Sequence, residues 1–146
     1  MKKEAMSPLN VILIDDEKFL RDVIQEGLVE LFGCTVRAVP DGESGLACLR
    51  ESGADVLLLD LLMPGVNGFE VLARLQSGNE MMHRPDRVIA MSALTDRTTL
   101  QTLQKLGVNY VLPKPFSLAE LRAALRLGEP TAYGSSARAI PVAQSA

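Results

Sequence analysis

Residues 55–60 read DVLLLD, four consecutive apolar side chains between two aspartates. The run VILID over residues 11–15 has the same character and also ends in an aspartate. Uninterrupted apolar runs of this length are typical of parallel strands covered on both faces, whereas a strand with one wet face alternates apolar and polar residues. The two runs therefore predict the buried centre of a parallel sheet, with a carboxylate at the end of each strand.

Segments on either side repeat a pattern of strand and helix. Three more strands are expected at residues 34–39, 87–92 and 108–112. The first of these carries polar Thr35 and Arg37, which suits a strand nearer an edge of the sheet. Five helices are marked by apolar side chains at helical spacing, namely Leu20, Val23, Ile24, Leu28 and Leu31; Leu46 and Leu49; Phe69, Leu72 and Leu75; Leu100, Leu103 and Leu106; Leu121 and Leu125. Strict alternation predicts an α/β fold, a parallel sheet with helices on both faces.

The ends of the helices carry signals of their own. Ser117 and Glu120 have the spacing of a capping box, in which a hydroxyl and a carboxylate each accept a hydrogen bond from a backbone N–H at the helix start. Gly33, Gly107 and Gly128 each follow an apolar helix end, where a left-handed cap residue is expected.

Composition narrows the class of protein. The chain has 146 residues, of which 47% are hydrophobic, and a formal net charge of −3 from 15 basic and 18 acidic side chains. That length suits one compact domain. A pI near 5.2 argues against a domain that grips nucleic acid through its own charge. No apolar run approaches the roughly 18 residues of a membrane span, and no apolar segment before Pro8 forms a secretory signal.

The chain divides into three expected parts. Residues 1–8 form a short lead and residues 9–128 a single domain, while residues 129–146, rich in Pro, Ser, Ala and Gly, predict a flexible tail or truncated linker. Cys34 and Cys48 have neither the spacing of a disulfide framework nor that of a metal site. They are expected to be buried, reduced thiols in a cytoplasmic protein.

Polar side chains stand where the expected strands end. In chain order they are Asp15 and Asp16, Asp60, Ser92 and Lys114. Ligands of an open parallel sheet bind at the carboxyl ends of its strands, so these groups are expected to lie together. Each also has an ordinary explanation: an aspartate that caps the next helix, a turn hydroxyl, or a solvated ammonium group.

Asp60 is hardest to explain as a surface charge, because three leucines precede it and a buried unpaired carboxylate is costly. Three converging carboxylates raise one another's pKa unless a cation is present. An all-oxygen set suits Mg²⁺ and not zinc. A hydroxyl and an ammonium group are partners for a phosphoryl group, and an aspartate can itself be the nucleophile. His83, alone in the longest loop, is expected to be merely solvated.

Four stretches carry a resemblance to the receiver domain of bacterial two-component response regulators: ILIDDE, LLLDLLMPGVNGFE, VIAMSALTD and VLPKPFS. The resemblance covers about residues 9–127. It implies the flavodoxin-like receiver fold, a five-stranded parallel sheet in the order 2-1-3-4-5. Asn67 stands where the family more often has Asp, a difference that touches no expected ligand.

The resemblance also assigns roles. It implies that Asp60 is the phosphoacceptor and that Mg²⁺ is held by Asp15, Asp16, Asp60 and the backbone carbonyl of Leu62. The Ser92 hydroxyl would turn toward the phosphoryl group and Lys114 would pair with it, with a cis bond between Lys114 and Pro115. Tyr110 matches the aromatic residue that swings inward when Ser92 moves, although an ordinary strand-edge tyrosine is an equally good interpretation.

The implied function is phosphorelay signalling rather than enzymatic turnover. A sensor histidine kinase or histidine phosphotransfer protein would donate the phosphoryl group. The surface of the fourth and fifth strand–helix units, which includes residues 96–106, Tyr110 and residues 117–127, would switch and control an effector protein or an output domain. The family also allows a homodimer through the fourth and fifth helices. The sequence leaves open whether an output domain follows residue 128.

Three other functions are compatible with parts of this pattern. A phosphatase of the haloacid-dehalogenase type needs a second aspartate two positions after the nucleophile, where this chain has Leu62. A flavodoxin-like flavin carrier needs a phosphate-binding loop after the first strand, where this chain has DDEKF. The main alternative is a receiver-like interaction module that acts without phosphorylation.

Leu62 and Leu94 flank the expected path of the water that would remove the phosphoryl group. Both side chains are bulky and apolar, so neither can orient a water molecule. They predict a long-lived phosphoryl group, unless they simply cover the surface of their loops.

Overall fold

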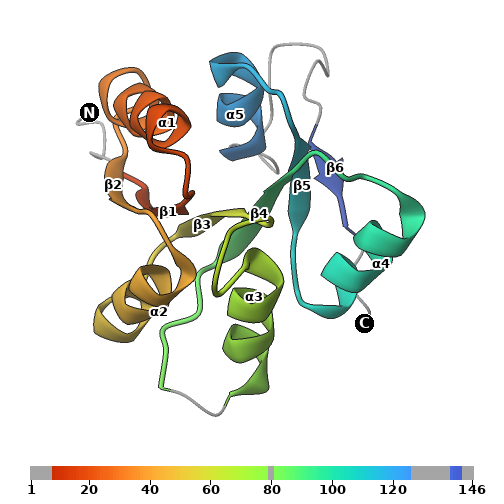
Figure 1. Cartoon of the computed structure of the whole chain (residues 1–146). Helices are drawn as coiled ribbons and strands as arrows, with labels where there is room; N and C mark the ends of the chain where they lie inside the picture. Colours follow the sequence, from red (N-terminus) through yellow and green to blue (C-terminus); the bar gives the residue numbers. More distant parts are fainter. Residues whose placement is uncertain (1–7, 79–80, 126–138, 143–146) are drawn as a thin grey trace, which may run out of the picture.

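The computed structural model describes residues 8–78, 81–125 and 139–142, and within these residues strands and helices alternate (Figure 1). The strands are β1 (Asn10–Ile14), β2 (Thr35–Val39), β3 (Val56–Asp60), β4 (Arg87–Ser92), β5 (Tyr110–Pro113) and β6 (Ile140–Pro141). The helices are α1 (Lys18–Glu30), α2 (Gly42–Glu51), α3 (Gly68–Ser77), α4 (Arg97–Lys105) and α5 (Leu118–Leu125). No helix in these residues is long and apolar enough to cross a membrane.

The sheet has the order β2-β1-β3-β4-β5-β6, and its first five strands run parallel. The predicted order of five strands and the placement of β2 at an edge are confirmed. The carboxyl ends of β1 and β3 therefore lie beside each other in the middle of the sheet, with the end of β4 next to them.

The sixth strand was not expected, and residues 139–142 correct the prediction of a flexible tail. Ile140 and Pro141 pair with β5 in the antiparallel direction, and the Val142 N–H donates to the Asn109 carbonyl at 2.9 Å. Only a tertiary contact with the free edge of β5 stabilises so short a strand, which explains why no periodic pattern announced it. The rest of that predicted tail, residues 1–7 of the expected lead over residues 1–8, and Gly128 lie outside the described residues.

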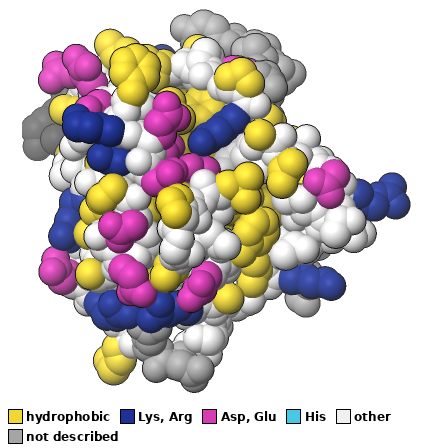
Figure 2. All heavy atoms as spheres, in the orientation of Figure 1, with side chains coloured by type: hydrophobic (Ala, Val, Ile, Leu, Met, Phe, Trp, Pro, Cys, Tyr) yellow, Lys and Arg dark blue, Asp and Glu magenta, His cyan; other side chains and the backbone are white. Residues whose placement is uncertain are grey.

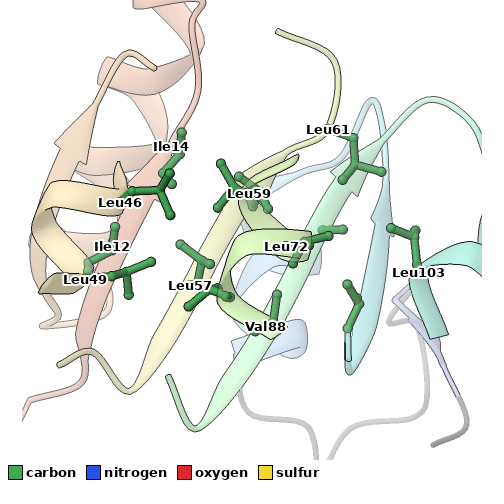
Figure 3. Packing of buried hydrophobic residues seen from close by; sticks show 14 of the residues in the cluster. Ile12, Ile14, Leu46, Leu49, Leu57, Leu59, Leu61, Leu72, Val88 and Leu103 are labelled. Atoms are coloured by element: carbon green, nitrogen blue, oxygen red, sulfur yellow. The ribbon is translucent and has the colours of Figure 1, made fainter. Parts of the chain in front are cut away.

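Helices cover both faces of the sheet, as predicted. α2, α3 and α4 lie on one side, and α1 and α5 lie on the other (Figure 1). Alternate residues of β1 and β3 face each layer: Ile12, Ile14, Leu57 and Leu59 pack toward α2 and α3 (Figure 3). Their neighbours Val11, Leu13, Val56 and Leu58 pack toward α1 and α5. Burial on both faces explains why the two central strands are apolar at every position.

Local signals at the helix ends also match the structure. The Ser117 hydroxyl accepts from the Glu120 N–H at 3.0 Å, and the Glu120 carboxylate accepts from the Ser117 N–H at 2.8 Å, which confirms the capping box before α5. Gly33 and Gly107 have φ angles of 71° and 84°, the left-handed conformation predicted for them. Both cysteines, Cys34 and Cys48, are buried and neither forms a disulfide, as expected.

Gly68 holds the start of α3 against the end of β3. A Cβ at this position would lie 2.6 Å from the Asp60 carbonyl oxygen and 2.7 Å from the Leu61 Cα, both backbone atoms that cannot move alone. We expect Gly68→Ala to lower the free energy of unfolding by about 1–3 kcal/mol, the usual effect of overpacking. Urea unfolding measures it, with Gly53→Ala as the control because its Cβ would meet His83 at an ordinary 3.5 Å. Equal midpoints for the two variants would contradict the close approach.

Candidate functional site

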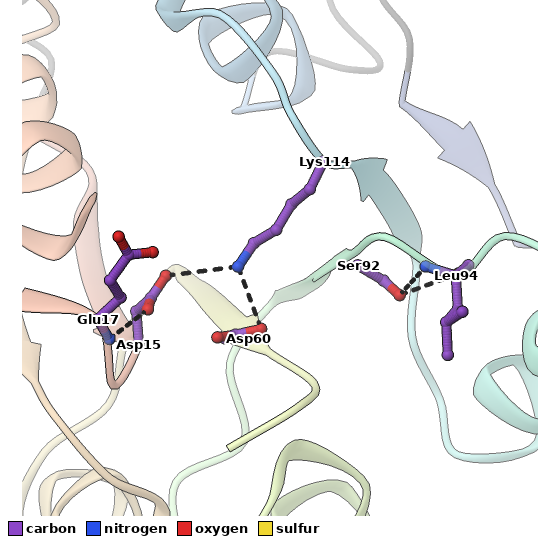
Figure 4. A network of polar contacts seen from close by, with 6 residues as sticks. All are labelled: Asp15, Glu17, Asp60, Ser92, Leu94 and Lys114. Carbon is purple, nitrogen blue, oxygen red and sulfur yellow. Dashed lines mark hydrogen bonds and ion pairs between the residues drawn. The ribbon is translucent and has the colours of Figure 1, made fainter. Parts of the chain in front are cut away.

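Three charged side chains meet at the carboxyl ends of the strands (Figure 4). Asp15 follows β1 and is fully buried, and Asp60 ends β3 and is 6% exposed. Lys114 follows β5 and reaches back over the sheet edge. Its Nζ lies 3.3 Å from Asp60 Oδ1 and 3.9 Å from Asp15 Oδ2. One ammonium group thus forms ion pairs with two buried carboxylates.

The ordinary explanation for the first acidic pair, a helix cap, is wrong. The N-cap of α1 is Glu17, and no side chain caps that helix. Asp15 Oδ1 instead accepts from the Glu17 backbone N–H at 2.9 Å, which turns the carboxylate inward toward the strand ends. Arg21, which we did not single out from the sequence, donates from Nη1 to the Asp15 carbonyl at 2.7 Å. Its position on the first turn of α1 was the available signal.

The acidic groups are arranged as a cation site would require. Asp15, Asp16 and Asp60 each offer a carboxylate oxygen, and these oxygens lie within 4.8 Å of one another. Asp16 is exposed, so the cluster is open to solvent on one side. Asp15 Oδ2 is buried and has no hydrogen-bond partner among the described residues. A buried oxygen that accepts no hydrogen bond, within an all-oxygen set, fits a hard divalent cation.

Burial dominates the electrostatics of both inner carboxylates. It raises the pKa of Asp15 and of Asp60 above their usual value, and the negative charge of Asp15 raises the pKa of Asp60 further. The Lys114 ammonium and backbone N–H groups oppose this effect, with the Glu17 N–H lowering the pKa of Asp15 and the Leu62 N–H that of Asp60. The site therefore holds more negative charge than its own residues neutralise, which favours a bound cation.

Ser92 ends β4 and is buried, but its hydroxyl is bonded within its own loop (Figure 4). Ser92 Oγ donates to the Leu94 carbonyl at 2.9 Å and accepts from the Leu94 N–H at 2.8 Å. The Ser92 carbonyl accepts from the Lys114 N–H at 2.8 Å, which ties the ends of β4 and β5 together. In this state the structure does not bring the hydroxyl into contact with Asp60.

The remaining candidates lie around the site or apart from it. Leu62 and Leu94 are 58% and 47% exposed, large apolar side chains on the loops after β3 and β4. Tyr110 stands at the opposite end of β5, half-buried against the layer formed with α5. The Lys114–Pro115 bond is cis, as predicted. His83 is exposed in its loop, and its backbone N–H donates to Leu49, so it takes no part in the cluster.

The surface view shows acidic side chains gathered in the middle of the face drawn in Figure 1, with basic side chains beside them and hydrophobic ones along their rim (Figure 2). Such a face offers negative charge to a metal ion and a positive group to an anion at the same place.

Comparison with known proteins identifies a matching family model and similar regulatory proteins. The family model described as response regulator receiver domain matches residues 11–126. The transcriptional regulatory protein TrcR of Mycobacterium tuberculosis is 36% identical over 121 residues, which cover 82% of this chain and 45% of that protein. A probable C4-dicarboxylate response regulator, DctR of Halalkalibacterium halodurans, is 32% identical over 126 residues, which cover 86% of this chain and 52% of that protein.

A solved structure of the Vibrio cholerae chemotaxis protein CheY4 superimposes with a TM-score of 0.71 at 26% identity, covering 82% of this chain and 97% of that one. The chain thus spans about half the length of the two curated relatives, and nearly the whole of the solved chemotaxis protein.

Proposed function

This chain belongs to the response regulator receiver domain family, and from that membership we propose that Asp60 accepts a phosphoryl group from a phosphohistidine donor in the presence of Mg²⁺. The observation that carries the assignment is the placement of Lys114 Nζ at 3.3 Å from Asp60 Oδ1, inside a cluster of three carboxylates. Such an arrangement pairs a buried nucleophile with positive charge for the oxygens of a phosphoryl group.

The chain's own residues account for the transfer. An Asp60 carboxylate oxygen attacks phosphorus, the bond between phosphorus and the donor imidazole nitrogen breaks, and its electron pair returns to that nitrogen. Lys114 holds its ammonium group where negative charge gathers on the phosphoryl oxygens. Asp15, Asp16, Asp60 and the Leu62 carbonyl would hold Mg²⁺, which, when bound, supplies further positive charge to those oxygens.

The output would follow from Ser92. We expect its hydroxyl to leave Leu94 and turn toward the phosphoryl group, and Tyr110 to move inward as the β4 loop shifts. The surface of α4, β5 and α5 would then differ between two states, and a partner that prefers one state would read the signal. The chain would thus act as a signalling domain. It would assist its own phosphorylation and dephosphorylation and would turn over no other substrate.

The proposed partners are a sensor histidine kinase or histidine phosphotransfer protein on the input side, and an effector protein or output domain on the other. We also propose that a homodimer can form through α4 and α5. We do not propose that this domain binds nucleic acid directly. We place the protein in the cytoplasm, a proposal supported by two buried cysteines that form no disulfide.

Intact-mass measurement tests the proposal. The protein is incubated with acetyl phosphate and Mg²⁺, and in parallel with EDTA. We expect the gain of one phosphoryl group with Mg²⁺ and none with EDTA. If neither acetyl phosphate nor a purified phosphohistidine donor adds a phosphoryl group, the chain is a receiver-like interaction module that acts without phosphorylation.

Leu62 and Leu94 lead to a prediction about the lifetime of the phosphoryl group. Both side chains border the site and lack a polar group, so attacking water is neither oriented nor deprotonated there. We expect Leu94→Glu or Leu62→Asn to speed the loss of phosphate about tenfold, because each supplies a group that positions water. The mass spectrum followed over time gives the rate, with Leu31→Glu, at the exposed C-cap residue of α1, as the control. Unchanged decay in both variants would mean that the leucines only cover their loops.

A further inference from the structure

The last described residues of the chain cover the outer edge of β5, on the surface proposed to carry the output (Figure 1). We propose that residues 139–142, here called the strap, occupy this edge in the unphosphorylated protein and must leave it before a partner binds there. We further infer that phosphorylation of Asp60 weakens the strap. The second statement and the partner in the first rest on the proposed function, whereas the pairing of the strap with β5 does not.

The strap makes specific contacts with the surface it covers. Pro141 pairs with Tyr110, Ile140 pairs with Val111, and the Val142 N–H donates to the Asn109 carbonyl at 2.9 Å. Without the strap, β5 would be the edge of the sheet, and its free backbone groups would form a template for another strand. The strap thus fills the position that an extended segment of a partner would take.

Side chains of the strap reach both layers of the core. Val142 is 8% exposed and belongs to the apolar cluster on the α4 side, where Ile140 also packs. Ala139 packs instead against the cluster on the α5 side. The segment therefore straddles the β5 edge between α4 and α5, and a protein that contacts both helices would meet it.

The strap is built to be displaced. Its pairing with β5 spans two residues, and Val142 is its one buried side chain. Pro141 has no N–H to donate, so the strap adds few backbone hydrogen bonds and cannot extend the sheet as a regular strand would. Ordering four residues for one buried side chain leaves a weak contact, of the kind that opens locally without unfolding the domain.

A continuous path joins the strap to the phosphorylation site. Tyr110, which pairs with the strap, begins the strand that runs to Lys114. Lys114 contacts Asp60 through its side chain and Ser92 through its backbone. A change at Asp60 that moves Ser92 and Tyr110 acts on the residue against which the strap pairs. By linkage, if phosphorylation weakens the strap, then loss of the strap must favour phosphorylation by the same factor.

The first experiment asks whether the strap forms. Hydrogen exchange is measured by mass spectrometry on the full chain, on Val142→Asp, and on the milder Val142→Ala. Val29→Asp, at an exposed valine on α1, is the matched control. We expect exchange of the residue 142 amide, which donates to the Asn109 carbonyl, and of the amides of paired residues 110 and 111 to rise about tenfold in Val142→Asp, less in Val142→Ala, and not in the control. Equal exchange in all four proteins would overturn the strap, whatever the phosphorylation chemistry proves to be.

The second experiment asks whether the strap is coupled to Asp60. Beryllofluoride with Mg²⁺ serves as the phosphoryl mimic. We expect it to bind Val142→Asp about fivefold more tightly than the wild-type chain, a coupling at the lower end of the usual range. We expect it also to raise exchange of the amides of residues 110, 111 and 142 in the wild type. Equal affinity in the two proteins would overturn the coupling and leave the proposed function intact. No binding to either would overturn both, and the first experiment would still decide whether the strap forms.

A variant in which a disulfide holds the strap against β5 should bind beryllofluoride more weakly, the opposite of the effect expected for Val142→Asp. Ile140 and Val111 are directly paired across the strands, so a cysteine at each position meets the distance requirement of a disulfide. We expect the oxidised double variant to bind beryllofluoride about fivefold more weakly than the same protein after reduction. Equal affinities before and after reduction would contradict a strap that must open.

Discussion

Replacing Asp60 by asparagine should abolish phosphoryl uptake and, in the same protein, raise the resistance to thermal unfolding. The first effect follows because an amide oxygen is not a nucleophile for phosphorus. The second follows because Asp60 is 6% exposed and carries a charge that burial opposes. An amide fills the same space without the cost of burying a charge.

The pH dependence separates this gain from a general improvement in packing. Burial raises the pKa of Asp60 in the folded protein, so the folded state binds the proton more tightly than the unfolded chain does. The free energy of unfolding of the wild type therefore falls as the pH rises from the usual pKa of 3.8 through the raised value. Asp60→Asn lacks this fall. We expect its advantage to be present at neutral pH and to vanish in acid below the usual pKa.

Thermal unfolding between pH 3 and 8, in EDTA, measures this difference, and intact mass after acetyl phosphate measures uptake. Asp86→Asn, at an exposed carboxylate, is the control for removal of one negative charge. Mg²⁺ should narrow the gap, because an ion that binds the folded wild type stabilises it by mass action. If Asp60→Asn still gains one phosphoryl group, the acceptor is another residue and the assignment of Asp60 is wrong.

The parts of the fold that the sequence predicts are those that depend on local or repeated patterns. The two apolar runs predict central strands because both faces of those strands are buried. Alternation then brings Asp15 and Asp60 to one edge of the sheet, since parallel strands end on the same side. The capping box before α5 lies within four residues and is equally local.

Features that depend on tertiary contacts could not be predicted in this way. The strap is a strand only because β5 has a free edge. Arg21 donates to the Asp15 carbonyl because α1 places its side chain beside the end of β1, a tertiary contact that the sequence pattern does not indicate. The Ser92 hydroxyl was expected to serve the phosphoryl group, and in this structure it closes its own loop onto Leu94. Which partner a hydroxyl takes depends on distances that a sequence does not contain.

Lys114→Met should lower the rate of phosphoryl uptake roughly 10²–10³-fold, the usual loss when one group that stabilises transition-state charge is removed. The methionine keeps most of the length of the side chain but leaves no charge 3.3 Å from Asp60 Oδ1. Uptake from acetyl phosphate, followed by mass at several concentrations, gives the rate. Lys105→Met on α4, at an exposed lysine, is the matched control.

The pH profile of uptake should move as well. Lys114 lowers the pKa of Asp60, so its removal raises that pKa and leaves less of the nucleophilic carboxylate at a given pH. The acid limb of the profile should therefore shift to higher pH in Lys114→Met. Lys114→Arg retains the charge and should keep the wild-type limb, even though the planar guanidinium cannot reproduce the position of the ammonium group. Equal acid limbs in the wild type and Lys114→Met would show that the lysine does not act on Asp60.

Stability offers a second, independent test of the same contact. Lys114→Met leaves Asp15 and Asp60 without their shared cation, so we expect lower stability at neutral pH, opposite in sign to Asp60→Asn. In the double variant Asp60→Asn with Lys114→Met, one of the two stranded charges is gone. The loss caused by Lys114→Met should therefore be smaller in the Asp60→Asn background than in the wild type. The interaction term of this double-mutant cycle isolates the pair, and a value of zero would mean that the two groups do not stabilise each other.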